Sequence, residues 1–219
     1  MKNIIKKTLK EQNKSINLLK LFVFSVLFVS HVAPAAYAME DDEETAKNLI
    51  LKRGKLWWGE SSFDCSWGKN GTIPAKDKRE GDGKTPEGSF YFRSVFYRPD
   101  RIDHIETKLP LRKVIKGEGG DGWCDEPNDP QYNQSVTLPY NGRHEVLWRD
   151  DNLYDIILVI GYNDSPVISN PPMGSAIFVH IRRDDGGPTA GCVSLDRAGL
   201  LKILEEAKPN SRAIFEHQN

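Results

Sequence analysis

The sequence of 219 residues has few cysteines and no pattern typical of a structural metal site. It contains three cysteines, and no two are spaced as Cys-x-x-Cys, the arrangement common in zinc sites. His144 and Glu145 begin like a zinc-protease helix, but Trp148 stands where the second histidine is required. The glycine-rich stretch 116–123 lacks the strand–turn–helix context of a dinucleotide site. We therefore expect neither a metal nor a cofactor.

The sequence also lacks an apolar run long enough to span a bilayer comfortably, which takes roughly 20 residues. The apolar run 21–29 is interrupted by Ser25, six lysines precede it, and an Ala-x-Ala site ends at Ala38. This order is typical of a secretory signal peptide. We expect residues 1–38 to be a signal peptide, which leaves an exported, periplasmic protein without a stable membrane anchor. An uncleaved anchor is the alternative.

No strongly basic segment follows. Removing residues 1–38 leaves 24 basic and 30 acidic residues, a net charge of −6. Such a chain is not expected to bind nucleic acid or anionic lipid. We assign residues 39–52 to an acidic lead-in and residues 53–219 to one catalytic domain, which we expect to be a monomer.

The odd number of cysteines is informative in an exported chain. Under oxidising conditions at least one of Cys65, Cys124 and Cys192 must stay free or pair outside the chain. The most economical pattern is a Cys65–Cys124 disulfide with Cys192 free. The free thiol is then the first candidate for a functional group.

Short β-prone runs separated by turn residues dominate the rest of the sequence. The clearest runs are 89–97, 155–162 and 175–181, and they favour an all-β sandwich or barrel. One helix is predicted after Asp196, which can cap it, and before Pro209, which ends it. A last strand is expected at 212–215. The fold class is therefore mainly β, with one or two short helices.

One histidine and one cysteine fit nucleophilic catalysis. Strand alternation puts Phe178 and His180 on one face of their run, and a polar turn then leads to Thr189-Ala190-Gly191-Cys192. An adjacent imidazole can take the proton of a thiol, and a glycine lets backbone N–H groups approach a carbonyl oxygen. The alternative is a buried core cysteine beside a satisfied core histidine.

At these residues the chain resembles the L,D-transpeptidase catalytic domain family of the YkuD type, in its compact single-domain branch. The family signature is a histidine on a strand, a loop, and then Ser/Thr-x-Gly-Cys. This chain carries Thr189-Ala190 where many members carry Ser-His, and it has Ser194 where many have Asn or Arg. The other matching blocks are 79–88, 122–127, 132–133, 147–149, 153–155 and 161–163.

The resemblance implies a β-sandwich and an acyl transfer on the peptide stems of peptidoglycan. Cys192 would attack the carbonyl of the third stem residue and release the terminal D-alanine, with His180 as base. The implied oxyanion donors are the N–H groups of Gly191 and Cys192, within the substrate-binding turn that also holds Thr189 and Ala190. An amine acceptor would give a 3→3 crosslink or D-amino-acid exchange, and water would give carboxypeptidase activity.

Further alternatives concern the reaction and the rim of the site. A thiol hydrolase of the same fold and a non-catalytic wall-binding domain both remain open. Tyr162 and Asn163 follow a buried-looking strand, and they either line the cleft or form a structural turn.

Overall fold

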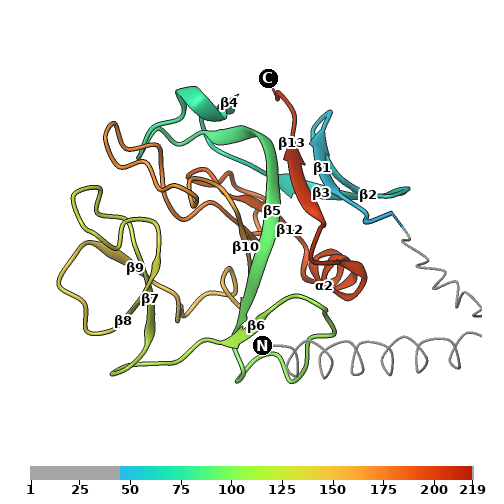
Figure 1. Cartoon of the computed structure of the whole chain (residues 1–219). Helices are drawn as coiled ribbons and strands as arrows, with labels where there is room; N and C mark the ends of the chain where they lie inside the picture. Colours follow the sequence, from blue (N-terminus) through green and yellow to red (C-terminus); the bar gives the residue numbers. More distant parts are fainter. Residues whose placement is uncertain (1–44, 219) are drawn as a thin grey trace, which may run out of the picture. The chain divides into compact units, whose positions relative to one another are not determined.

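The computed structural model describes residues 45–218, which fold into thirteen strands, most of them short, and one α-helix (Figure 1). The strands are β1 (Leu49–Lys52), β2 (Lys55–Trp58), β3 (Ser61–Ser66), β4 (Thr72–Pro74), β5 (Thr85–Tyr97), β6 (Leu111–Lys113), β7 (Asp121–Cys124), β8 (Ser135–Thr137), β9 (His144–Val146), β10 (Ile156–Ile160), β11 (Phe178–Ile181), β12 (Val193–Leu195) and β13 (Arg212–Phe215). The helices are α2 (Arg197–Glu206) and a 3-10 turn, η1 (Ala75–Asp77). The predicted mainly β class is confirmed, while the sandwich arrangement stays a prediction.

The strands of the large sheet are joined in the order β10-β11-β12-β3-β2-β1-β13-β5-β4. The long strand β5 has two partners along its length. Residues 88–91 pair with β13, and residues 92–97 pair with β10. The pairing therefore returns to its first strand, and β5 connects the part of the sheet that carries β10 and β11 to the rest.

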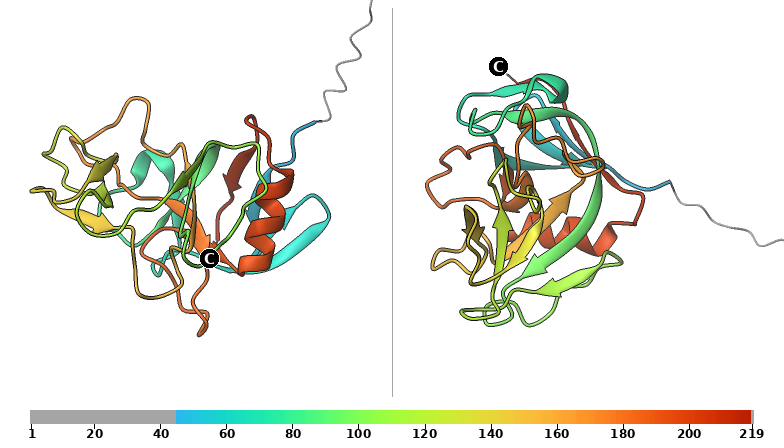
Figure 2. Two further views of the ribbon diagram at one scale, coloured as in Figure 1. Left: turned by 90° about the horizontal axis from the view of Figure 1, so that it is seen from below. Right: turned by 60° about the vertical axis from the view of Figure 1, so that its left-hand side comes forward.

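A second, three-stranded sheet with the order β8-β7-β9 packs against the β10–β11 pair. Trp123 of β7 meets Phe178 of β11 edge-on at a centroid distance of 5.0 Å, and it meets Phe96 of β5 at 6.4 Å. This small sheet lies on the opposite side of β5 and β10 from helix α2 (Figures 1 and 2). The aromatic contacts make the small sheet a wall over one face of the large one.

The predicted strands and helix occur where the sequence pattern placed them. The run 89–97 lies within β5, the runs 155–162 and 175–181 contain β10 and β11, and the last expected strand is β13. Asp196 caps α2 by accepting a hydrogen bond from the Gly199 N–H at 2.9 Å. The expected alternation also holds, since Phe178 packs with the small sheet while Val179 and Ile181 face the main core.

Two predictions need correction. The lead-in expected at 39–52 overlaps β1, whose Leu49 and Leu51 are buried because the strand pairs with both β2 and β13. The expected Cys65–Cys124 disulfide is not formed, and all three cysteines are free. Cys65 lies in β3 and in the main core, whereas Cys124 ends β7 in the small sheet.

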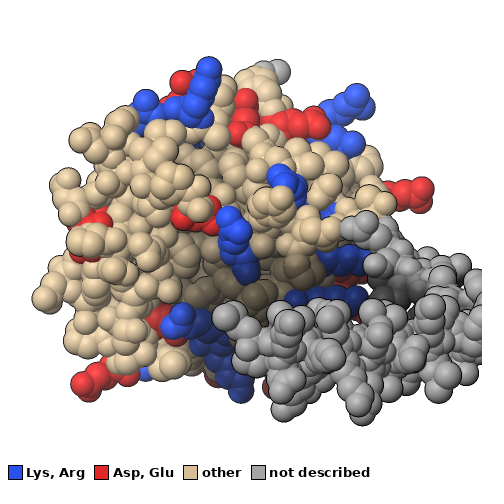
Figure 3. Space-filling model, in the orientation of Figure 1, with Lys and Arg blue, Asp and Glu red and all other residues tan. Residues whose placement is uncertain are grey.

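The predicted signal peptide, residues 1–38, lies outside the described residues. Within residues 45–218 no helix has the length and apolar character needed to cross a membrane. The face seen in Figure 3 carries acidic and basic side chains interspersed, without a broad patch of one sign.

Candidate active site

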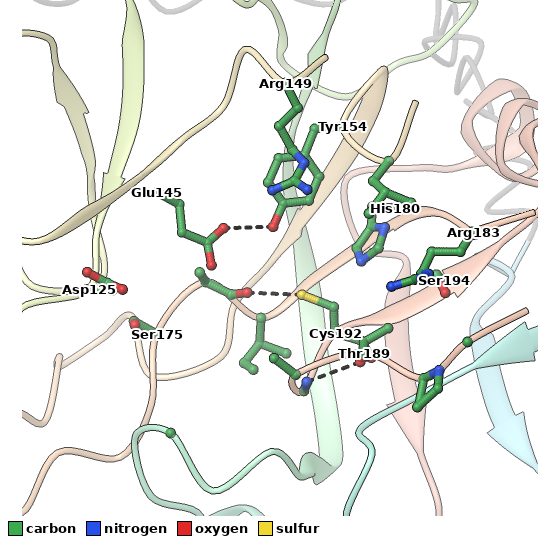
Figure 4. Close-up of a pocket in the computed structure, with 18 of the residues that line it drawn as sticks. Asp125, Glu145, Arg149, Tyr154, Ser175, His180, Arg183, Thr189, Cys192 and Ser194 are labelled. Carbon is green, nitrogen blue, oxygen red and sulfur yellow. Dashed lines mark hydrogen bonds between the residues drawn. The ribbon is translucent and has the colours of Figure 1, made fainter. Parts of the chain in front are cut away.

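Parallel pairing of β11 with β12 places His180 and Cys192 in one cavity. His180 is level with Ser194, and Val179 with Val193, so Cys192 precedes β12 beside Phe178. Since side chains alternate along a strand, His180, Ser194 and Cys192 project from the same face. Both the imidazole and the thiol line a cavity of about 320 Å³. Figure 4 shows them reaching into this space from neighbouring strands.

The imidazole of His180 is held in a defined orientation. Its Nδ1 lies 2.8 Å from the carbonyl oxygen of Ile181. A carbonyl can only accept, so Nδ1 carries the proton and Nε2 is left as an acceptor. The side chain is 5 % exposed, and burial lowers its pKa to about 4. The ring is therefore neutral at neutral pH and able to take a proton at Nε2.

The thiol of Cys192 is also neutral in the resting protein. Sγ donates to the carbonyl oxygen of Ala176 at 3.1 Å and receives a hydrogen bond from the Phe178 N–H at 3.4 Å. Burial is the main cause that raises its pKa to about 12, followed by the negative charge of Glu145. The N–H groups of Phe178 and of Cys192 itself act in the opposite direction.

The turn before the thiol is organised by Thr189. Its hydroxyl donates to the Cys192 carbonyl at 2.6 Å and accepts from the Gly191 N–H at 3.1 Å. Gly191 has φ +149°, and a Cβ there would lie 3.0 Å from both Ile177 Cδ1 and the Lys84 carbonyl oxygen. Glycine is thus required at this position on steric grounds. Ala190 is exposed and lines the cavity mouth with Thr189.

Asn133 links Ala176, whose carbonyl accepts the hydrogen bond of the thiol, to other parts of the fold. Its Oδ1 accepts from the Trp123 indole N–H and from the Ala176 N–H, each at 3.0 Å. Its Nδ2 donates to the carbonyl oxygens of Tyr162 at 3.0 Å and Asn163 at 2.8 Å. Ala176 has φ +51°, a left-handed conformation that a non-glycine residue adopts only when its surroundings hold it there. Asn133 supplies part of that restraint.

The small sheet contributes an acidic wall to the cavity. Glu145 of β9 accepts a hydrogen bond from the Tyr154 hydroxyl at 2.7 Å. The Tyr154 ring packs edge-on against His180, with centroids 5.4 Å apart, and the Arg149 guanidinium lies 5.1 Å from the same ring. In Figure 4 the thiol lies between His180 on one side and Glu145 on the other.

Lys78 and Glu80 complete the cavity at the end near Ser175. The Lys78 ammonium is buried and donates to Asp82 at 2.7 Å. Glu80 accepts from the hydroxyls of Tyr132 at 2.6 Å and Ser175 at 2.8 Å. Within residues 45–218, no group of three His, Cys, Asp or Glu side chains is arranged to hold a metal ion.

The structure separates the predicted site residues into two sets. Cys192, His180, Gly191, Thr189 and Ala190 line the cavity. Tyr162 and Asn163 do not, which favours the structural turn over a place in the cleft. The Tyr162 hydroxyl donates to the Met173 carbonyl, and Asn163 exchanges hydrogen bonds with the backbone of Ile168 and Gly174. Both brace the loop that leads into β11.

Four further cavity residues had no role in this site assigned from the sequence: Lys78, Glu80, Glu145 and Tyr154. They come from segments more than 25 residues away from Cys192. Glu80 and Tyr154 fall in two of the blocks that carry the family resemblance, but those blocks assign them no role.

One known family matches this chain. The family model described as YkuD, L,D-transpeptidase catalytic domain, matches residues 42–214. No curated protein and no solved structure gives a match. Because the family match covers most of the sequence, the chain belongs to the L,D-transpeptidase catalytic domain family.

Proposed function

We propose that this protein is a peptidoglycan L,D-transpeptidase in which Cys192 is the nucleophile and His180 is the base. The observation that carries the proposal is the orientation of His180. Its Nδ1–H is committed to the Ile181 carbonyl, and its unprotonated Nε2 faces the cavity that also holds the thiol. Family membership supports peptide stems of peptidoglycan as the substrate.

The first half-reaction converts a thiol into a thioester. As Sγ attacks the carbonyl carbon of the third stem residue, its proton moves to Nε2 of His180. The C–N bond to the terminal D-alanine then breaks, and the same proton passes to the leaving amine. The thiol proton points to the Ala176 carbonyl in the resting protein. It must turn from that carbonyl toward Nε2 of His180 before it can be transferred.

The developing oxyanion needs N–H donors. Of the two amides expected in this role, that of Cys192 already faces the sulfur. The Gly191 amide donates to Thr189 and has to exchange this bond for one to the substrate. Its hydrogen bond of 3.1 Å is at the long end of the usual range, which makes the exchange inexpensive.

The second half-reaction determines the product. Attack by an amine of a second stem gives a 3→3 crosslink, a free D-amino acid gives exchange, and water gives a tripeptide. We place the reaction in the periplasm on the order of residues 1–38, a basic segment, an apolar core and an Ala-x-Ala site. We expect the protein to act as a monomer.

Product analysis tests this proposal. Purified protein is incubated with disaccharide-tetrapeptide, and the products are identified by mass spectrometry beside a Cys192→Ala control. We expect Cys192-dependent release of D-alanine and a dimer that lacks one D-alanine. Tripeptide monomers alone would instead indicate a hydrolase, and no change with either protein would contradict the proposal.

A further inference from the structure

Glu145 lines the reaction cavity but takes no part in the two half-reactions proposed above. Its carboxylate lies in the reaction cavity across the thiol from His180 (Figure 4). Both residues line this cavity, and the negative charge of Glu145 is, after burial, the next largest cause that raises the pKa of Cys192. A charged group in this cavity acts on whatever approaches the thioester.

One oxygen of the Glu145 carboxylate is held by a hydrogen bond, and the other is free to accept one. Its Oε2 is fixed by the Tyr154 hydroxyl at 2.7 Å, while Oε1 accepts no hydrogen bond from any residue between 45 and 218. Tyr154 is in turn held by its packing against Phe178 and His180. Oε1 is thus a preorganised acceptor at a fixed place beside the nucleophile.

Glu145 forms no ion pair with any residue between 45 and 218. The Arg149 guanidinium lines the same cavity but is engaged with Asp151 through two hydrogen bonds. Burial raises the pKa of the Glu145 carboxyl, and the negative charges of Asp125 and Glu80 add to this, while the Tyr154 hydroxyl and the Arg149 charge act in the opposite direction. A cation at Oε1 would offset both the burial and this repulsion.

An organic ammonium fits this requirement better than a metal ion, because the acids are not arranged to chelate one. The two possible acyl acceptors, an amine and water, differ in charge. An amine enters as a cation at neutral pH, whereas water carries no charge. A carboxylate beside the thioester therefore attracts and orients the amine but does not attract water in the same way.

We propose that Glu145 is the residue that selects an ammonium-bearing acceptor over water, and so directs the acyl-enzyme toward transfer. This inference rests on the proposed function. In the step, the bound ammonium gives one proton to solvent, and the amine lone pair forms the new C–N bond. The C–S bond breaks, and the second amine proton passes through His180 to the Cys192 sulfur.

The partition of the acyl-enzyme tests the inference. Isotope-labelled tetrapeptide is the donor and unlabelled tripeptide is the amine acceptor, so labelled tripeptide reports hydrolysis and mixed dimer reports transfer. Both products come from the same thioester, so their ratio does not depend on how much of the protein is folded.

In Glu145→Gln we expect the ratio of dimer to labelled tripeptide to fall about tenfold or more, as for the loss of a charge-assisted hydrogen bond. The acceptor concentration for half-maximal transfer should rise correspondingly. Glu145→Asp should recover part of the ratio, and Glu118→Gln, which removes an exposed carboxylate outside the cavity, should leave it unchanged.

The outcomes separate the two proposals. An unchanged ratio in Glu145→Gln would overturn this inference alone, as would a wild-type protein that releases D-alanine yet never transfers to the amine. A wild-type protein that releases no D-alanine would overturn the proposed function and the role of Glu145 with it.

Discussion

At the scale of single residues, the candidate pair rests as a neutral thiol and a neutral imidazole. Burial raises the pKa of Cys192 to about 12 and lowers that of His180 to about 4. A preformed thiolate–imidazolium pair would need the opposite order of pKa values. In the proposed reaction the thiolate would therefore form only when a substrate carbonyl is in place.

This resting state predicts a slow, pH-dependent alkylation. Between pH 6 and 9 we expect iodoacetamide to modify Cys192 about 100-fold or more slowly than a free cysteine, with a rate that keeps rising above pH 9. The rate is measured by mass spectrometry of the peptide that contains Cys192, with the unfolded chain as control. A plateau of fast alkylation below pH 8 would show that a thiolate exists before substrate binds.

The buried histidine also makes stability depend on pH. The unfolded chain binds a proton at His180 below about pH 6.5, while the folded chain resists protonation down to about 4. Stability from this residue is complete above pH 6.5 and is lost as the pH falls toward 4. We expect wild type to lose about 2–3 kcal/mol more than His180→Asn between pH 7 and 4.5. Urea unfolding at both pH values measures this, and equal losses would refute it.

At the scale of elements, Asn133 joins β7, the turn after β10 and the segment before β11. Asn133→Ala would leave the buried N–H groups of Trp123 and Ala176 without their acceptor. We expect a loss of about 2–5 kcal/mol in unfolding free energy and a lower rate of D-alanine release, because Ala176 also holds the thiol. The neighbouring Gln134→Ala, whose side chain is exposed, is the control. Equal stability of the two variants in urea would contradict this role.

The sequence predicted the elements whose signals are local. The long β-prone runs became β5, β10 and β11, and the cap at Asp196 with the stop at Pro209 delimited α2. The strands β6 to β9 have only three or four residues each, in segments rich in Gly, Pro and Asn. These strands pair with segments elsewhere in the chain, and the periodicity of their own hydrophobic residues does not identify those partners. The wall that carries Glu145 could not be predicted for the same reason.

The site residues divide along the same line. His180 and the turn from Thr189 to Cys192 form one short motif, and the parallel register of β11 and β12 places both in one cavity. Tyr162 and Asn163 were equally plausible from composition alone. Only the structure of the loop 164–174 showed that their side chains donate hydrogen bonds to its backbone carbonyls.

At the scale of the whole molecule, the fold holds together without a disulfide. Cys65 and Cys124 lie in different sheets, and burial raises the pKa of both thiols. We expect three reactive thiols per chain when the purified protein is unfolded without reductant and titrated with a chromogenic disulfide. A count of one would mean that the Cys65–Cys124 bond forms after all.

The large sheet carries Cys192 and His180, and the small sheet carries Glu145 in the wall that faces them. Trp123, Phe178 and Phe96 hold the two sheets together beside the thiol. The cavity is thus shaped by the packing of whole sheets, and the proposed acceptor side of the reaction lies on the smaller sheet.

The most direct test of this account is to trap the acyl-enzyme. Protein is mixed with tetrapeptide at low concentration, quenched in acid within seconds and analysed by intact-protein and peptide mass spectrometry. The account predicts an added mass equal to the stem without its terminal D-alanine, located on Cys192 and absent from Cys192→Ala. It also predicts much slower formation of this adduct in His180→Asn. D-alanine release without any adduct on Cys192, or an adduct on another residue, would contradict the central claim.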